Sequence, residues 1–187
     1  MTETKSTALR FGTELGERLK GIYGLARRPR NPDDFFLLLK AESAKQLGTK
    51  VFLDRVRSGR AVIGRSDAQT KDWISRGGSE TVFTLCSYDT LMTAVLRGDS
   101  VIGSACPHCG ETMTVRIRKG KLEDFIPEGM VFLWGAGPEG SPGNPMCDHL
   151  HLFPSKSHMD RWIESKVGEM GFSFSLQEFV KRLEQRF

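Results

Sequence analysis

Residues 112–118 alternate between polar and apolar side chains, and this pattern constrains the fold more than any other in the chain. The side chains of Met113, Val115 and Ile117 fall on one face of an extended segment, while threonine and arginine fall on the other. A period of two residues is that of a β-strand with one buried face and one face in water. Such a strand needs neighbours for its backbone hydrogen bonds, so the pattern predicts a sheet with a core on one side.

Further elements are predicted around this strand. Short apolar runs predict strands at 80–85, 100–105, 130–134 and 149–153, and helical spacing predicts helices at 88–96, from Ser157 and from the capping box Ser175–Glu178. Glycine and proline predict a surface loop at 135–145. Together these elements predict an α+β fold, with a mixed β-sheet core and flanking helices.

The first part of the chain has a mostly helical pattern. Helices are predicted over 9–26 and 33–47, a strand at 60–64 and a short helix around Trp73 at 66–76. The run at 51–56 is too short to distinguish a strand from a helix. We therefore divide the chain into an N-terminal helical region, 1–79, and a second domain, 80–187.

The net charge of +4 comes from basic residues that are spread along the chain. The one cluster, Arg27–Arg30, has no aromatic residues within it, which favours a solvated turn over a nucleic-acid surface. No apolar run reaches the length of a membrane span, and the first residues lack the layout of a signal peptide. We therefore expect a cytoplasmic protein whose partners include neither nucleic acid nor a membrane.

In a reducing compartment the four cysteines, Cys86, Cys106, Cys109 and Cys147, are expected to bind metal or take part in catalysis rather than form disulfides. Cys86 and Asp89 stand three residues apart at the start of a predicted helix, so they would share one face. The positive end of the helix dipole would favour a thiolate at Cys86. Two thiolates select soft metals, and a carboxyl beside them can carry a proton.

Two motifs in the second half resemble those of one enzyme family. The first is CSYDTLM, which begins at Cys86, and the second is MCDHLHLFPS, which contains Cys147. Between them stand a cysteine turn, the strand TMTVRI and the phrase IPEGM. Their order and separations resemble the catalytic domain of organomercurial (alkylmercury) lyases from about Thr81 to about Trp162, which implies the α+β fold of that family.

The resemblance implies an enzyme that cleaves carbon–mercury bonds by protonolysis, giving a hydrocarbon and Hg(II) as bound product. Two cysteines and an aspartate do this chemistry in the family, and they match Cys86, Cys147 and Asp89; a mainly structural cysteine of the family matches Cys106. No organic cofactor is implied. The partners implied are an organomercurial substrate and, as acceptors of Hg(II), small thiols or mercuric reductase, which would serve mercury resistance and detoxification.

Two of the sequence's departures from the family bear on its function. Residues 1–80 do not match the family's helical N-terminal domain, which leaves open a lyase for another organometal or organometalloid compound. Cys106 is followed by Pro-His-Cys109, a C-x-x-C turn that zinc sites use and that the family typically lacks. Zinc at Cys106 and Cys109, completed by Cys147 and a histidine, would instead make this a non-enzymatic zinc-, copper- or mercury-binding protein on the same fold.

Overall fold

The computed structural model describes residues 11–45, 49–75, 81–138 and 146–186. The helices are α1 (Thr13–Tyr23), α2 (Pro32–Lys45), α3 (Thr49–Arg57), α4 (Ser87–Arg97), α5 (Lys156–Glu164) and α6 (Leu176–Arg186), with a short 3-10 helix η2 (Cys147–His149). The strands are β1 (Arg65–Ser66), β2 (Asp72–Ser75), β3 (Val82–Thr84), β4 (Ser100–Ala105), β5 (Thr112–Arg118), β6 (Lys121–Ile126), β7 (Val131–Ala136), β8 (Leu150–Phe153) and β9 (Met170–Ser175). The predicted α+β class is confirmed. None of the helices described is long and apolar enough to cross a membrane.

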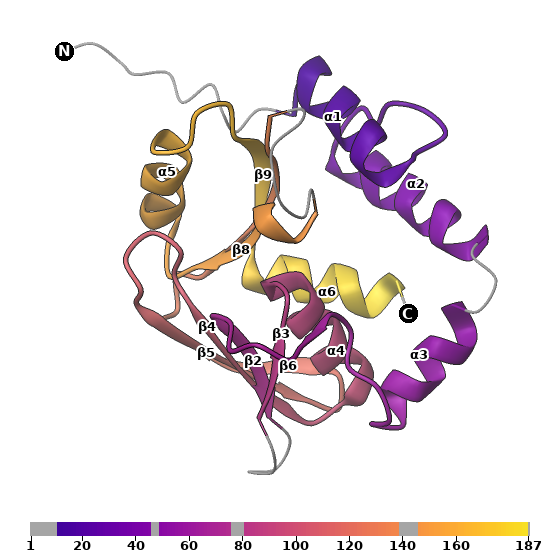
Figure 1. Cartoon of the computed structure of the whole chain (residues 1–187), viewed down its shortest axis with the longest axis vertical. Helices are drawn as coiled ribbons and strands as arrows, with labels where there is room; N and C mark the ends of the chain where they lie inside the picture. The colour runs from indigo at the N-terminus through magenta and orange to yellow at the C-terminus, as the bar shows by residue number, and fades with distance from the viewer. Residues whose placement is uncertain (1–10, 46–48, 76–80, 139–145, 187) are drawn as a thin grey trace.

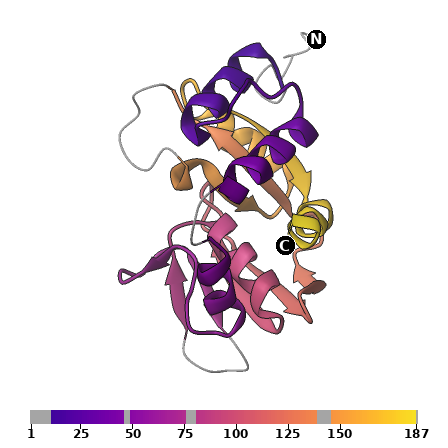
Figure 2. The same cartoon turned by 90° about the vertical axis from the view of Figure 1, so that its right-hand side faces the viewer.

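The strands form two sheets, and every strand pair described is antiparallel. The larger sheet has the order β1-β3-β2-β4-β5-β6 and the smaller one the order β8-β7-β9. The alternating segment is β5, whose apolar side chains are all buried. Figures 1 and 2 show the two sheets one above the other, and α6, which contacts both, runs between them. The chain passes from one sheet to the other at 127–130, where Pro127 has no N–H for a strand ladder.

Two predictions between residues 60 and 75 are wrong. Residues 60–64 form an irregular turn instead of a strand, and residues 72–75 form strand β2 where a helix was predicted. Trp73 of β2 lies over Gly103 of β4, and a Cβ at Gly103 would approach the indole ring to 2.0 Å. The strand was missed because it is short and begins with a charged residue, Asp72, which is fully buried by partners from distant segments.

Several other boundaries differ. The ambiguous run at 51–56 lies in α3, and strands β6 and β9 were not predicted. The predicted loop at 135–145 begins later, because β7 continues to Ala136, and residues 139–145 of that prediction lie outside the described residues. The capping box at the start of α6 is present in part, since the Glu178 backbone N–H donates to the Ser175 hydroxyl at 3.2 Å.

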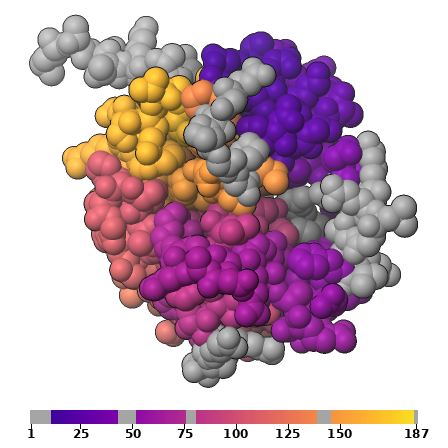
Figure 3. Space-filling model, viewed as in Figure 1, coloured from indigo at the N-terminus to yellow at the C-terminus, as the bar shows by residue number. Residues whose placement is uncertain are grey.

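Helices α1 and α2 pack on the smaller sheet through aromatic rings. Phe35 contacts Trp134 of β7 and Phe172 of β9, with ring centroids 5.1 and 5.9 Å apart, and Tyr23 of α1 contacts both Phe35 and Trp134. Figure 3 shows these helices on the same side of the molecule as the orange and yellow C-terminal segments. Since β1 and β2 also precede residue 80 but belong to the larger sheet, both parts of the chain contribute to the packed structure. The division at 79/80 stays a prediction.

Candidate active site

The start of α4 positions Cys86 and Asp89. Cys86 is the N-cap residue, with an extended backbone (φ −155°, ψ 168°), and Asp89 lies in the first turn. The Thr90 hydroxyl donates to the Cys86 carbonyl at 2.9 Å, and the Thr84 hydroxyl lies 3.5 Å from the same oxygen. These buried hydroxyls hold the Cys86 backbone in place. Because α4 contacts β2 and β4 of the larger sheet and β8 of the smaller one, its first turn lies where the two sheets meet.

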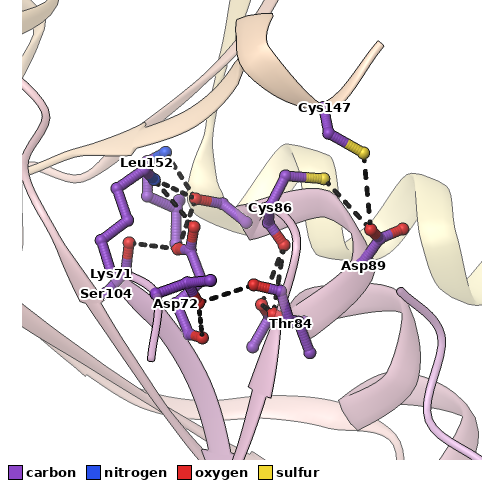
Figure 4. Close-up of polar contacts among 11 residues, drawn as sticks. Lys71, Asp72, Thr84, Cys86, Asp89, Ser104, Cys147 and Leu152 are labelled. Carbon is purple, nitrogen blue, oxygen red and sulfur yellow. Dashed lines mark hydrogen bonds and ion pairs between the residues drawn. The ribbon is translucent and has the colours of Figure 1, made fainter. Parts of the chain in front are cut away.

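Cys147 reaches the Asp89 carboxyl from a different segment, η2. The Sγ atom of Cys86 lies 3.4 Å from Oδ2 of Asp89, and the Sγ atom of Cys147 lies 3.7 Å from the same oxygen (Figure 4). Each of the three side chains has a ligand atom within 4.8 Å of those of the other two. Cys86 and Asp89 are buried, with exposed fractions of 1% and 8%, whereas Cys147 is half-buried. The structure therefore brings together two thiols and a carboxyl that the sequence places in distant segments.

The surroundings favour the protonated forms of Cys86 and Asp89. The pKa of the Cys86 thiol is raised, first by the hydrogen bond it shares with Cys147, then by burial and by the charge of Asp89. The backbone amide of Asp89 opposes this shift but does not outweigh it, so these surroundings favour the Cys86 thiol, whereas the helix dipole alone would favour the thiolate. Burial also raises the pKa of Asp89, against the lowering effect of its hydrogen bonds to the two thiols.

A buried polar network lies directly behind Cys86. The Asp72 carboxylate accepts hydrogen bonds from the hydroxyls of Ser87 and Ser104, at 2.7 and 2.6 Å, and from Nζ of Lys71 at 2.8 Å (Figure 4). The Leu152 backbone N–H donates to the Ser87 hydroxyl at 3.2 Å. The network therefore joins β2, β4, the first residue of α4 and β8 around one carboxylate.

A pocket of about 520 Å³ adjoins the two sulfurs and Asp89. Most of its remaining wall is apolar, with side chains from α1, α2, α4 and β7 among others: Ile22, Tyr23, Leu39, Met92, Trp134 and Leu150. The hydroxyl of Tyr23 and the indole N–H of Trp134 are buried, and the two groups interact with each other in this wall. Burial raises the pKa of Tyr23, so its phenol is neutral. Sequence analysis missed both residues, because nothing in helical or strand spacing shows which cavity an aromatic side chain lines.

The family of this chain follows from comparison with known proteins. The sequence profile of the alkylmercury lyases matches residues 66–185, which is more than half of the chain. The chain belongs to the alkylmercury lyase family. It is an organomercurial lyase-like enzyme, as the two motifs implied, and the matched region extends beyond them on both sides.

A solved structure supports the fold of this lyase. The crystal structure of the mercury-bound form of MerB2 matches with a TM-score of 0.53 and 23% sequence identity, covering 94% of this chain and 99% of that one. Because 94% of this chain is covered, the match extends into residues 1–80, whose sequence did not resemble the family's N-terminal domain. A comparison with curated protein sequences gives no match.

The lyase's other two cysteines lie outside this constellation. Cys106 is buried and Cys109 is exposed, in the turn that follows β4. The Cys109 sulfur lies within 4.8 Å of ligand atoms of a glutamate and of a histidine of α5. The Cys147 sulfur instead lies within 4.8 Å of the Cys86 sulfur. Among the described residues, therefore, Cys147 does not complete a metal site with Cys106 and Cys109.

Proposed function

We propose that this lyase cleaves organomercurials with Cys86 and Cys147 as mercury-binding thiolates and Asp89 as the proton donor. The observation that carries the proposal is the convergence of both thiols on one carboxyl oxygen, at 3.4 and 3.7 Å, beside an apolar pocket. Mercury is soft and binds thiolates strongly, while a buried carboxyl can hold the proton that the departing carbon needs. The same three groups therefore supply both the mercury ligands and the proton that protonolysis requires.

Cys147 meets the substrate first, because it is the more exposed of the two thiols. Its sulfur forms a bond to mercury of R–Hg⁺ and releases its proton. Cys86 then adds a second sulfur to the metal. The raised pKa of Cys86 keeps its proton in place until mercury, a strong Lewis acid for sulfur, displaces it. Oδ2 of Asp89 is the atom that both thiols face, so a displaced thiol proton can restore the carboxyl proton once Asp89 has given its own to carbon.

Two thiolates raise the electron density on mercury and weaken its bond to carbon. The electron pair of the carbon–mercury bond then takes the proton from Asp89. The overall change is R–Hg⁺ plus two thiols giving R–H, a mercury ion bound to both sulfurs, and one proton released to solvent. Burial favours the neutral carboxyl that this transfer requires, since it raises the pKa of Asp89.

The pocket holds the organic group during this change. Its apolar wall would exclude water from the developing carbanion and orient the carbon toward Asp89. The Tyr23 hydroxyl and the Trp134 indole N–H are buried polar groups in this wall. We assign them to substrate positioning, because both line the pocket that contains the two sulfurs.

The decisive experiment incubates reduced protein with methylmercury or phenylmercury and excess small thiol, and follows the release of methane or benzene. Asp89→Asn should slow release by about 10²–10⁴-fold, the usual contribution of a positioned general acid. Cys86→Ser and Cys147→Ser should abolish it. Ser58→Ala is the control, since this exposed serine follows α3 outside the constellation and its loss should leave turnover unchanged.

Unchanged turnover in both Asp89→Asn and Cys147→Ser would contradict the assignment of these residues. If no hydrocarbon is released while mercury still binds tightly, the chain keeps the fold as a metal-binding scaffold. Release from organotin or organoarsenic compounds, but not from organomercurials, would identify a lyase for a different carbon–metal or carbon–metalloid bond.

We further propose that the protein acts in the cytoplasm in mercury resistance and detoxification. The reaction requires both thiols reduced, and no disulfide forms among the described residues, which include all four cysteines. The Hg(II) product would leave by exchange with small thiols or with the thiols of mercuric reductase. An incoming thiol could reach the bound mercury because Cys147 is only half-buried.

A further inference from the structure

A second group of metal-ligating side chains lies where the β4–β5 turn meets α5. The Sγ atom of Cys109, a carboxylate oxygen of Glu111 and a ring nitrogen of His158 all lie within 4.8 Å of one another. In Figure 1 the turn between β4 and β5 extends toward α5, which follows β8 of the other sheet. The three residues therefore come from two segments that only the fold brings together.

The turn itself has the geometry of a metal-binding knuckle around Cys106. The Cys106 N–H donates to the Glu111 carbonyl, and the Gly110 N–H donates to the Cys106 carbonyl, both at 2.9 Å. Gly110 has a φ of +78°, a conformation that a residue with a side chain rarely adopts. The turn therefore closes tightly and carries both cysteines, Cys106 and Cys109, on one short segment.

The two thiols of this turn interact with each other. The Cys106 sulfur shares a hydrogen bond with the Cys109 thiol, and the backbone amides of His108 and Cys109 also lie close to it. These contacts place the two sulfurs near each other, as two thiolate ligands of one metal ion would have to be.

His158 is already oriented for a metal. Its Nδ1 lies 2.8 Å from the Ser155 hydroxyl, and its Nε2 faces a carboxylate oxygen of Glu111 at 3.7 Å. Metal-bound histidines usually have the second ring nitrogen held by such a partner, which fixes the ring and its tautomer. Ser155 thus leaves Nε2 directed toward the group that contains Cys109.

We propose that Cys106, Cys109, Glu111 and His158 bind one zinc ion. Two thiolates, an imidazole and a carboxylate are ligands that Zn²⁺ accepts in tetrahedral sites, at metal–ligand distances of about 2.0–2.3 Å. Rotation of the exposed side chains of Cys109 and Glu111 would close the site around the ion. Four protein ligands leave no open position, so the ion is structural.

The zinc ion cross-links the two sheets. The β4–β5 turn belongs to the larger sheet, while α5 packs on β7 and β8 of the smaller sheet. Cys147, whose position relative to Asp89 matters for the proposed reaction, lies just before β8. A bond between the β4–β5 turn and α5 therefore limits relative movement of the two sheets that carry the active-site segments.

The test measures zinc binding by the reduced full chain in competition with a chromophoric chelator, and repeats it with Co²⁺ as a spectroscopic probe. One zinc per chain is expected, and the cobalt form should show thiolate-to-metal charge transfer. Cys109→Ser and His158→Ala should each weaken binding by at least about 100-fold, and Ser155→Ala by about 10–100-fold, as for other partners of metal-bound histidines. Zinc should raise the Tm of the wild type but not that of Cys109→Ser.

Two control variants make the outcome specific. His108→Ala removes the other histidine of this turn, and Cys147→Ser removes a thiol of the proposed active site; both should keep the zinc affinity. Zinc that is lost in Cys147→Ser but retained in Cys109→Ser would place the metal at the active site and overturn the proposal. A wild-type protein that binds no zinc, or a cobalt spectrum without thiolate charge transfer, would overturn it as well. Circular dichroism of each variant separates loss of metal from loss of fold.

Discussion

At the scale of single residues, the Asp89 carboxyl occupies space that a side chain at position 64 would fill. A Cβ on Gly64 would lie 2.0 Å from Oδ2 of Asp89 and 2.5 Å from its Cγ. Gly64 also has a φ of +56°, and its carbonyl accepts a hydrogen bond from the Leu85 N–H at 2.7 Å, just before Cys86. One glycine therefore sets both the position of the carboxyl and the path of the chain into α4.

Gly64→Ala should consequently damage catalysis more than mercury binding. The added methyl group would displace the Asp89 carboxyl, and a misplacement of about 1 Å can cost about 10²-fold in rate. Hydrocarbon release should fall by about that factor, while Cys86 and Cys147 still bind mercury in equilibrium titrations. Gly24→Ala is the matched control, because Gly24 has a similar φ of +59° but a Cβ there meets no atom within 4 Å. Equal turnover in the two variants would contradict this role for Gly64.

The raised pKa of Asp89 also predicts a pH dependence of stability. Below its ordinary pKa of 3.8 this group is protonated in both the folded and the unfolded chain. As the pH rises toward the higher pKa of the folded state, the unfolded state ionises first, and stability is lost. Asp89→Asn removes this titration, so its stability relative to the wild type should increase as the pH rises from about 3.8. Urea unfolding across a pH series measures the difference.

For Asp34 we expect the opposite pH dependence of stability. The Arg27 guanidinium and the Arg30 backbone N–H lower the pKa of Asp34 to about 2. Its contribution to stability is present above its ordinary pKa of 3.8 and is lost as the pH falls toward about 2. Asp34→Asn should therefore be less stable than the wild type at neutral pH, with the difference disappearing in acid. Identical pH profiles for the two variants would refute at least one of the two assignments.

At the scale of elements, the buried carboxylate of Asp72 determines how α4 meets the strands around it. Its network contacts the Ser87 hydroxyl, and Ser87 directly follows Cys86 at the start of α4. The same hydroxyl accepts the Leu152 N–H of β8, three residues after η2 ends. The two segments that carry the thiols are thus connected through a single serine.

Ser87→Ala should therefore loosen this connection. The change leaves the Leu152 N–H and the Asp72 carboxylate short of a hydrogen bond in a buried site, which costs about 1–3 kcal/mol. The free energy of unfolding in urea should fall by that amount. The control is Ser58→Ala, an exposed serine whose removal should change stability by less than about 0.5 kcal/mol. A loss no greater than that of the control would show that the network is replaced by other contacts.

The elements that sequence predicted well are those whose own pattern decides their structure. The alternation of β5 survives in the fold because it buries one apolar face, and α4 keeps its helical spacing although its buried face mixes Leu91 and Val95 with polar side chains. β2 and β9 were misjudged for a different reason. β2 buries Asp72 and β9 contains serine and glycine, so their strand character depends on neighbours far away in the sequence. That Cys86 and Cys147 lie close together could likewise be predicted only from the resemblance to a known family. No rule of sequence spacing relates η2 to α4.

At the scale of the whole molecule, the two parts of the chain share one pocket. Tyr23 of α1 and Leu39 of α2 line it together with Cys86 and Cys147, so the N-terminal helices form part of the wall around the proposed substrate. Those helices are held by the aromatic rings they place on the smaller sheet. Packing of the N-terminal helices and formation of the pocket therefore depend on the same contacts.

Phe35→Ala tests whether the helices and sheets unfold together. Phe35 is fully buried and contacts rings on both β7 and β9, so its loss should cost about 3–5 kcal/mol. If the helices and sheets form one cooperative unit, circular dichroism and tryptophan fluorescence should report a single transition at lower urea concentration. Leu37→Ala on the same helix is the control, because Leu37 is 65% exposed and should have little effect. Two separated transitions in Phe35→Ala would mean instead that α1 and α2 unfold independently, as a separate N-terminal region ending near residue 79 would allow.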